Sequence, residues 1–233
     1  MSGWKKTLLN LFFPHHCFLC STVLPQDKHM CAECMPRAPY ILPPVCPQCG
    51  RSEDVCICGH HTHAFERCIS PFYHKDMVQE AILHMKQVYD TVVAEGFALE
   101  MAEVIRREYG GIAFDFVTSV PLHKKDRQVR GFDQARGLAE ALARRLGLPY
   151  AAVLTKLTHT QPQKELTAIR RRGNLLGVFD VIADVEGRTI LLVDDVITTG
   201  TTLDECAKML KIFGAEEVYA VTAAAAGLKS DDR

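Results

Sequence analysis

The chain has almost no net charge and no long uninterrupted hydrophobic run. Its 27 lysines and arginines nearly balance 28 aspartates and glutamates, so the formal net charge is −1 over 233 residues. A global positive field that attracts nucleic acid is therefore excluded, and any nucleic-acid contact must come from local patches. Apolar residues make up 48% and charged residues 24%, a balance typical of globular proteins that argues against wholesale disorder.

The amino-terminal segment lacks the pattern of a signal peptide or a membrane anchor. Lys5 and Lys6 precede a short apolar run, but Asn10 interrupts this run and no small-residue cleavage site follows. The run also falls short of the roughly 18 apolar residues that a transmembrane helix needs. Its apolar residues recur at helical spacing up to Pro14, which predicts a short amphipathic helix. We expect a cytoplasmic protein without a transmembrane segment, and secretion is the alternative.

Cysteine is almost absent outside one segment, because nine of the ten lie between Cys17 and Cys68. A disulfide framework would need an oxidising compartment, to which the sequence offers no clear route. The segment begins with two Cys-x2-Cys pairs. Two residues between thiolates let both sulfurs reach one metal, and two such pairs complete a tetrahedral zinc site. The ligands predicted for the first zinc site are Cys17, Cys20, Cys31 and Cys34.

A second zinc site is predicted further along the same segment. Its ligands would be Cys46, Cys49, Cys56 and Cys58. Gly50 suits the left-handed turn that often closes such a knuckle. The Cys-x-Cys pair is tighter than usual, so a neighbouring histidine could replace one sulfur: His60, His61 or His63. Both sites would be closed and therefore structural.

The alternative to zinc is a set of free thiols. A loop-rich segment with few large apolar residues has little else to fold around, which favours metal-driven folding. Cys68 and Cys206 have no partner in these motifs and are predicted to be buried as small apolar residues.

Beyond residue 70 the sequence alternates between helical and strand-like patterns. Four helices are predicted, Asp76–Lys86, Val92–Arg107, Gln134–Leu146 and Thr201–Phe213, the last two ended by Gly147 and Gly214. Three strands are predicted, Asp115–Val120, Arg188–Val193 and Glu217–Thr222. The strand Arg188–Val193 contains the continuous apolar run Ile190–Val193, which is typical of a strand buried on both faces. We expect an α/β fold, with a mostly parallel sheet flanked by helices (residues 69–233), behind a module of the short helix and zinc ribbons (residues 1–68).

The most informative segment is ILLVDDVITTGTT, residues 190–202. The strand is predicted to end at Val193, so Asp194 and Asp195 would emerge at its carboxyl end, where ligands bind in open α/β sheets. Gly200 lets backbone amides approach an anion, and the following helix adds its positive amino-terminal end. Flanking hydroxyls add donors: Thr198, Thr199, Thr201 and Thr202. Because carboxylates suit sugar hydroxyls or hydrated Mg²⁺ instead, the segment predicts a site for a phosphorylated ribose. An ordinary capped loop is the alternative.

This segment resembles the loop of type I phosphoribosyltransferases that binds phosphoribosyl pyrophosphate (PRPP). In those enzymes two acidic residues bind the ribose hydroxyls and the Thr/Gly stretch holds the 5-phosphate. Further motifs resemble the ComF family of competence-associated proteins: VPLH at 120–123, RGFDQA at 130–135, the spaced residues from Gln163 to Phe179, and the double zinc ribbon. The resemblance implies a type I phosphoribosyltransferase-like fold, with Mg²⁺ accompanying PRPP. Asp133 stands where the family commonly has asparagine, which weakens any role that needs a neutral amide there.

By the same resemblance, the loop after Val120 would face pyrophosphate, and the segment around Thr158–Arg172 would close over the ligand. The candidate residues are His123, Lys124, Arg170 and Arg171. Basic side chains can neutralise a pyrophosphate group. Basic runs are equally typical of a solvated surface or of attraction to nucleic acid.

The family is associated with uptake of transforming single-stranded DNA into the bacterial cytosol. The resemblance therefore implies a protein that binds PRPP and assists in handling this DNA. The zinc ribbons and basic segments would contact nucleic acid or a protein partner from the uptake machinery, such as a helicase, and that partner could hold the chain at the inner face of the membrane. An active, Mg²⁺-dependent phosphoribosyltransferase with an unidentified acceptor is the alternative, and the sequence leaves open whether the protein is an enzyme. A structural adaptor with a vestigial site is less attractive, because the acidic pair and the threonines are intact.

Overall fold

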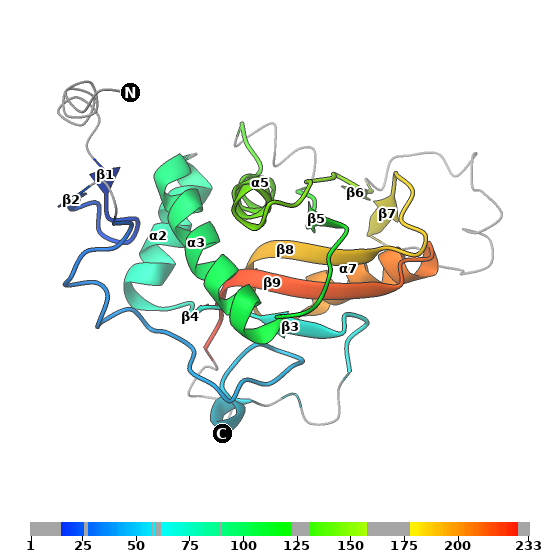
Figure 1. Ribbon diagram of the computed structural model, residues 1–233, viewed down its shortest axis with the longest axis horizontal. Helices are drawn as coiled ribbons and strands as arrows, with labels where there is room; N and C mark the ends of the chain where they lie inside the picture. Colours follow the sequence, from blue (N-terminus) through cyan, green and yellow to red (C-terminus); the bar gives the residue numbers. More distant parts are fainter. Residues whose placement is uncertain are drawn as a thin grey trace.

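A parallel β-sheet forms the centre of the protein (Figure 1). The computed structural model describes residues 15–25, 28–56, 58, 62–88, 90–122, 131–157 and 178–227. The strand order is β3-β9-β8-β5, and β4 also pairs with β9, all in parallel. Their bounds are Arg67–Ile69 (β3), Phe72–Tyr73 (β4), Phe116–Ser119 (β5), Thr189–Ile197 (β8) and Glu217–Ala225 (β9). The short β3 and β4 follow one another along the same edge of β9.

Helices cover both faces of the sheet (Figure 1). One face packs against α2 (Asp76–Gln87), α3 (Thr91–Glu108) and α5 (Gln134–Leu146), and the other against α7 (Thr201–Ile212). Side chains along β8 alternate between the two cores, with Leu191 and Val193 in the first and Ile190 and Leu192 in the second, and all four are fully buried. The predicted α/β fold with a strand buried on both faces is confirmed.

Helix boundaries agree with the sequence patterns to within a residue. The helix α5 spans the predicted Gln134–Leu146, and Gly147 ends it in the left-handed conformation with φ of 69°. Asp90 caps α3, because its carboxylate accepts hydrogen bonds from the amides of Val92 (2.9 Å) and Val93 (3.3 Å). No helix in the described ranges is both long and apolar enough to cross a membrane.

The predicted end of the strand before the acidic pair was wrong. Instead of ending at Val193, β8 continues to Ile197. The reason is its neighbour β9, which stays paired with β8 up to the register of Ile197 with Ala225. On the other side, β5 pairs with β8 only as far as Val193. The acidic pair therefore lies within β8, just past the point where β5 ends.

Shorter elements complete the described part. The strands β1 (His15–His16) and β2 (Val23–Leu24) pair antiparallel, as do β6 (Leu154–Lys156) and β7 (Phe179–Val181). A single turn of 3-10 helix, η1, spans Glu53–Val55. The predicted amino-terminal helix and the polar, basic stretch from Thr158 to Asn174 lie outside the described residues.

The cysteine-rich segment shares its core with the helices. Phe18, from the first knuckle, is buried and meets the ring of Phe97 edge-on at 5.0 Å between centroids. It lies against Gly96 of α3, where an added Cβ would come within 2.3 Å of the Phe18 ring. The second knuckle contacts β3, because the amide of Cys68 donates to Pro47 (2.7 Å) and Gly50 bridges to Ile69. Both knuckles are thus part of the packed structure.

Candidate ligand site and metal centres

The first cysteine cluster has the geometry of a four-thiolate metal site. The sulfur atoms of Cys17, Cys20, Cys31 and Cys34 lie within 4.8 Å of one another. Backbone amides point at the sulfurs, with Cys31 N donating to Cys17 Sγ (3.4 Å) and Cys34 N to Cys31 Sγ (3.3 Å). Tetrahedral zinc with bonds of about 2.3 Å needs sulfurs roughly 3.8 Å apart. Cys20 and Cys31 approach this with 3.6 Å between their sulfurs.

The second cluster consists of Cys46, Cys49, Cys56 and Cys58. Its sulfurs also lie within 4.8 Å of one another, and 3.7 Å separates those of Cys49 and Cys56. Gly50 closes the knuckle with φ of 67°, as its position predicts. Two four-cysteine clusters suit two structural zinc ions. His63 faces α7, and His60 and His61 lie outside the described residues.

The remaining two cysteines are buried away from these clusters. Cys68 in β3 and Cys206 in α7 are both fully buried in the core beneath α7. Burial raises the pKa of each thiol, so both stay protonated at neutral pH. The prediction that they serve as small apolar core residues is confirmed.

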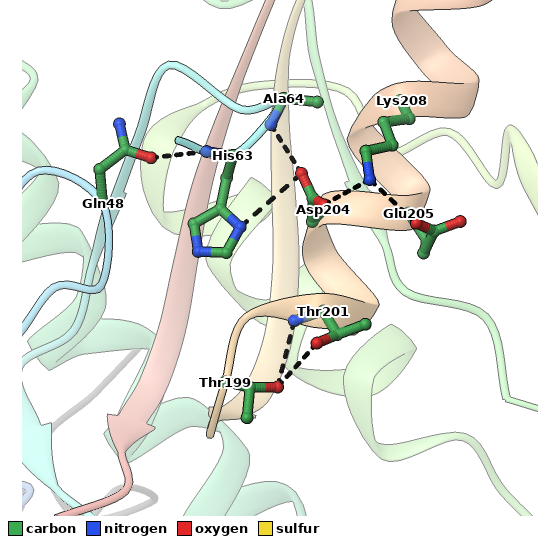
Figure 2. Close-up of polar contacts among 8 residues, drawn as sticks. All are labelled: Gln48, His63, Ala64, Thr199, Thr201, Asp204, Glu205 and Lys208. Atoms are coloured by element: carbon green, nitrogen blue, oxygen red, sulfur yellow. Dashed lines mark hydrogen bonds and ion pairs between the residues drawn. The ribbon is translucent and has the colours of Figure 1, made fainter. Parts of the chain in front are cut away.

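The Thr/Gly stretch forms the turn between β8 and α7. Gly200 is buried at the N-cap of α7 with φ of 84°, and the hydroxyl of the preceding Thr199 accepts a long hydrogen bond from the amide of Thr201 (3.4 Å, Figure 2). The first amides of a helix have no partner within the helix, so this end can donate to an anion. The threonines on either side of Gly200 are exposed, and the hydroxyls of Thr199 and Thr201 lie 2.8 Å apart. Donors are thus concentrated at one exposed turn.

The two aspartates precede this turn. Asp194 and Asp195 are half-buried, and the amide of Asp195 donates to the Asp194 carboxylate (2.9 Å). Burial, followed by the charge of Asp195, raises the pKa of Asp194 well above its ordinary value. Asp195 is paired with Lys86 of α2, with 2.8 Å between Nζ and Oδ2. Hydroxyl donors or a cation bound at this pair would reduce the repulsion between the two carboxyl groups.

In the first turn of α7, Asp204 contacts the segment that follows the second cysteine cluster (Figure 2). Its carboxylate accepts a hydrogen bond from the amide of Ala64 (2.7 Å) and pairs with Lys208 (2.7 Å). Its Oδ1 also lies 3.7 Å from Nδ1 of His63. These contacts lower the pKa of Asp204 despite its burial, so it stays ionised.

The predicted pyrophosphate residues His123, Lys124, Arg170 and Arg171 lie outside the described residues. The flank that the structure describes, Pro121 and Leu122, lines a small pocket of about 170 Å³ past the end of β5. Polar side chains contribute to this pocket: Ser119, Asp133, Arg136 and Tyr150. The loop after Val120, which we predict to face pyrophosphate, therefore begins at the edge of a partly polar pocket.

Asp133 has a local structural role. As the N-cap of α5, it accepts hydrogen bonds from the amide of Arg136 (3.1 Å) and from that of Leu122 (3.4 Å). Asparagine can cap a helix equally well, since its side-chain oxygen accepts the same bond. The departure from the family's usual asparagine is therefore compatible with this capping.

Sequence patterns missed three residues close to the turn: Lys86, Arg51 and Asp204. In the sequence, Lys86 cannot be told from an ordinary exposed lysine in the last turn of a helix. Asp204 likewise cannot be told from an ordinary acidic residue in the first turn of a helix. Arg51 immediately follows the second knuckle. A charged residue next to a predicted turn glycine is a weak signal, because most such residues are solvated.

Two segments of the chain match known protein families. Residues 8–69 match the family model described as a double zinc ribbon domain, and residues 133–232 match the phosphoribosyl transferase domain. The DNA utilization protein YhgH of Salmonella typhimurium is 30% identical over 207 residues, which cover 87% of this chain and 86% of the relative.

Two further relatives carry competence names. Competence protein F of Haemophilus influenzae is 38% identical over 106 residues, 44% of this chain and 46% of that protein. Competence protein ComFC of Bacillus subtilis is 28% identical over 199 residues, 81% of this chain and 80% of that protein. This chain belongs to the ComF family. The ComF architecture of a double zinc ribbon and a type I phosphoribosyltransferase-like fold agrees with the sheet and the cysteine clusters described above.

Proposed function

We propose that this ComF-family protein binds PRPP with Mg²⁺ at residues 194–202 and assists the handling or import of transforming single-stranded DNA in the cytoplasm. The observation that carries the proposal is the pairing of an exposed donor turn with two crowded carboxylates at one end of β8. A phosphate fits the turn and the amino-terminal end of α7. A diol fits this pair, because carboxylate oxygens accept hydrogen bonds from hydroxyl groups.

Binding would exchange contacts at the acidic pair. The ribose hydroxyls would donate to Asp194 and Asp195, and the amino group of Lys86 would leave Asp195 or shift toward the pyrophosphate. Mg²⁺ prefers oxygen ligands and would neutralise the pyrophosphate oxygens of bound PRPP. The 5-phosphate would be held by the hydroxyls and amides of Thr199, Thr201 and Thr202.

Calorimetric titration with PRPP and Mg²⁺ tests the ligand. We expect a saturable binding heat that fits one PRPP site per chain. The affinity for PRPP should be lower when Mg²⁺ is left out. Ribose 5-phosphate should compete, because it shares the phosphate and the diol but lacks pyrophosphate. Heat indistinguishable from that of dilution would remove PRPP as the ligand.

The DNA part of the proposal is supported by the names of the relatives, which refer to DNA utilization and competence. With a net charge of −1, the chain must contact DNA through local basic segments. We propose that the segments containing Lys124 and Arg171 contact the DNA. We also propose that the zinc ribbons bind a protein partner such as a helicase. The partner could hold the protein at the inner face of the membrane.

Affinity for single-stranded DNA is expected to fall steeply with salt. For each phosphate that the protein neutralises on a single strand, the logarithm of the binding constant falls by roughly 0.7 per tenfold rise in salt. Lys124→Ala/Arg171→Ala should therefore reduce the slope by about 1.4, measured by fluorescence anisotropy in a salt series. Arg106→Ala, which removes an exposed arginine paired with Glu103, is the control and should leave the slope unchanged. A binding constant that does not depend on salt would count against DNA contact through phosphates.

Catalysis is the alternative function. A pyrophosphate-release assay with PRPP, run with candidate bases and with single-stranded DNA, separates it from binding alone. Release that depends on one acceptor would establish a phosphoribosyltransferase. PRPP binding without release would favour a role in which the ligand is bound and not consumed.

A further inference from the structure

Arg51 joins the second cysteine knuckle to the phosphate turn. Its side chain is buried, with 6% of the residue exposed. The guanidinium donates from Nη2 to the carbonyl oxygen of Thr198 (2.6 Å) and from Nε to that of Ala226 (2.8 Å). Thr198 begins the turn after β8, and Ala226 follows the end of β9. One buried cation therefore fixes the ends of both central strands.

The contact with Thr198 fixes the direction of the turn's first peptide group. In a trans peptide the carbonyl and the following amide point in opposite directions. Because the Thr198 carbonyl points at Arg51, the amide of Thr199 must point away from the guanidinium. This leaves that donor turned away from Arg51, at a residue that is exposed to solvent.

A second contact reaches the turn from the same segment. The ring of His63 is almost fully buried and lies so close to Gly200 that an added Cβ would be 3.0 Å from its Nε2. Figure 2 shows His63 directed at α7 and the neighbouring Ala64 bound to Asp204. The positive φ of Gly200 favours glycine, and the His63 ring leaves little room for a side chain at this position.

Arg51 and His63 are both hydrogen-bonded to the second knuckle. The amide of Cys46 donates to the carbonyl of Arg51 (2.8 Å), which holds the arginine backbone against the knuckle. Gln48, which lies between Cys46 and Cys49, accepts a hydrogen bond from the amide of His63 (2.9 Å). Changes in the shape of this knuckle would thus be transmitted to the turn at Thr198 and at Gly200.

We propose that Arg51 is a positioning residue for phosphate binding, through which the second zinc ribbon, with His63, holds the 198–202 turn in its ligand-binding shape. This role rests on the proposed PRPP site, and it identifies a structural feature that sets the affinity of this site for PRPP. The ribbon acts on the ligand without touching it, and the integrity of the second cysteine cluster becomes a condition for tight PRPP binding.

The test compares PRPP affinity in Arg51→Met, Arg51→Lys and the wild type by calorimetry. Arg51→Met is expected to bind PRPP about tenfold more weakly, because Thr198 loses a charge-assisted hydrogen bond. Arg51→Lys should recover part of the loss, since lysine keeps the positive charge but lacks the planar guanidinium that donates to the two carbonyls from different nitrogens. Arg67→Met is the matched control. It removes a partly buried arginine that pairs with Glu108 (2.6 Å), far along the chain from the turn, and should bind PRPP normally.

Hydrogen exchange of the 199–203 amides provides a readout independent of PRPP. Faster exchange in Arg51→Met, with the same zinc content as the wild type, supports the proposal. Wild-type affinity together with unchanged exchange would overturn it and leave PRPP binding intact. If the wild type binds no PRPP, the proposed ligand fails, and the exchange rates alone decide whether the ribbon controls the turn. If Arg51→Met does not fold, Arg51→Lys decides on the same readouts.

Discussion

Asp194→Asn/Asp195→Asn is expected to bind PRPP at least a hundredfold more weakly than the wild type. Each carboxylate would accept a ribose hydroxyl, and hydrogen bonds to charged groups contribute about 1.5–3 kcal/mol each. Losing two corresponds to roughly 3 kcal/mol, or two orders of magnitude in affinity. Calorimetry in the presence of Mg²⁺ measures the loss.

The single change Asp194→Asn should separate ligand binding from stability. Burial and the neighbouring Asp195 raise the folded pKa of Asp194 above its unfolded value. The folded state then binds this proton more tightly, so wild-type stability falls as pH rises from the unfolded pKa through the folded one. Asparagine has no charge to lose. The variant should therefore melt at a higher temperature than the wild type at pH 7, with the difference shrinking toward pH 4.

Asp115→Asn is the matched control, because the pKa of Asp115 is shifted in the opposite direction to that of Asp194. The amide of Thr189, at the start of β8, and the side chain of Arg188 lower the pKa of Asp115. A lowered pKa contributes stability that is present above the unfolded pKa and lost as pH falls through the folded one. Asp115→Asn should thus melt lower than the wild type at pH 7 and bind PRPP normally. An Asp194→Asn variant that melts lower at pH 7 and keeps its affinity would show that Asp194 has a structural role.

Zinc removal is expected to have the largest effect on stability. Structural zinc contributes about 10–16 kcal/mol in zinc-finger peptides, which is as large as the stability of a whole domain. Metal analysis should find about two zinc ions per chain, and Cys46→Ser/Cys49→Ser should retain one. A chelator should lower the thermal midpoint of the whole protein, because Cys17, Phe18 and Cys31 belong to the same core as α3.

Cys206→Ala is the control for this prediction, since Cys206 is buried outside both clusters. It should keep two zinc ions and lose little stability. One zinc ion in the wild type would show that Cys46, Cys49, Cys56 and Cys58 do not form a closed site. Two ions in Cys46→Ser/Cys49→Ser would place the second metal elsewhere.

Local patterns predicted the elements whose signal lies within a short window. The leucine stripe and Gly147 defined α5, and the apolar run before Asp194 defined a strand buried on both faces. Cysteine spacing predicted both clusters in the same way, since the requirement for two sulfurs to reach one metal is local. These signals need no knowledge of the rest of the fold.

Contacts between distant segments could not be predicted. The short β3 has three residues, too few for a periodic pattern, and it pairs along its length with β9, about 150 positions away. The β8 strand passes its predicted end because β9 stays paired with it. The contact between Arg51 and Thr198 spans 147 positions. Motifs thus identified the candidate ligand site, whereas its support from the second ribbon required the folded chain.

A structure of the complex with PRPP and Mg²⁺ tests the central claim most directly. We expect the 5-phosphate within hydrogen-bond distance of the amides or hydroxyls of Thr199–Thr202. The ribose hydroxyls should lie on Asp194 and Asp195, with Lys86 displaced from Asp195. PRPP bound only in the pocket between Ser119 and Tyr150, with the turn after β8 free of ligand, would contradict the claim.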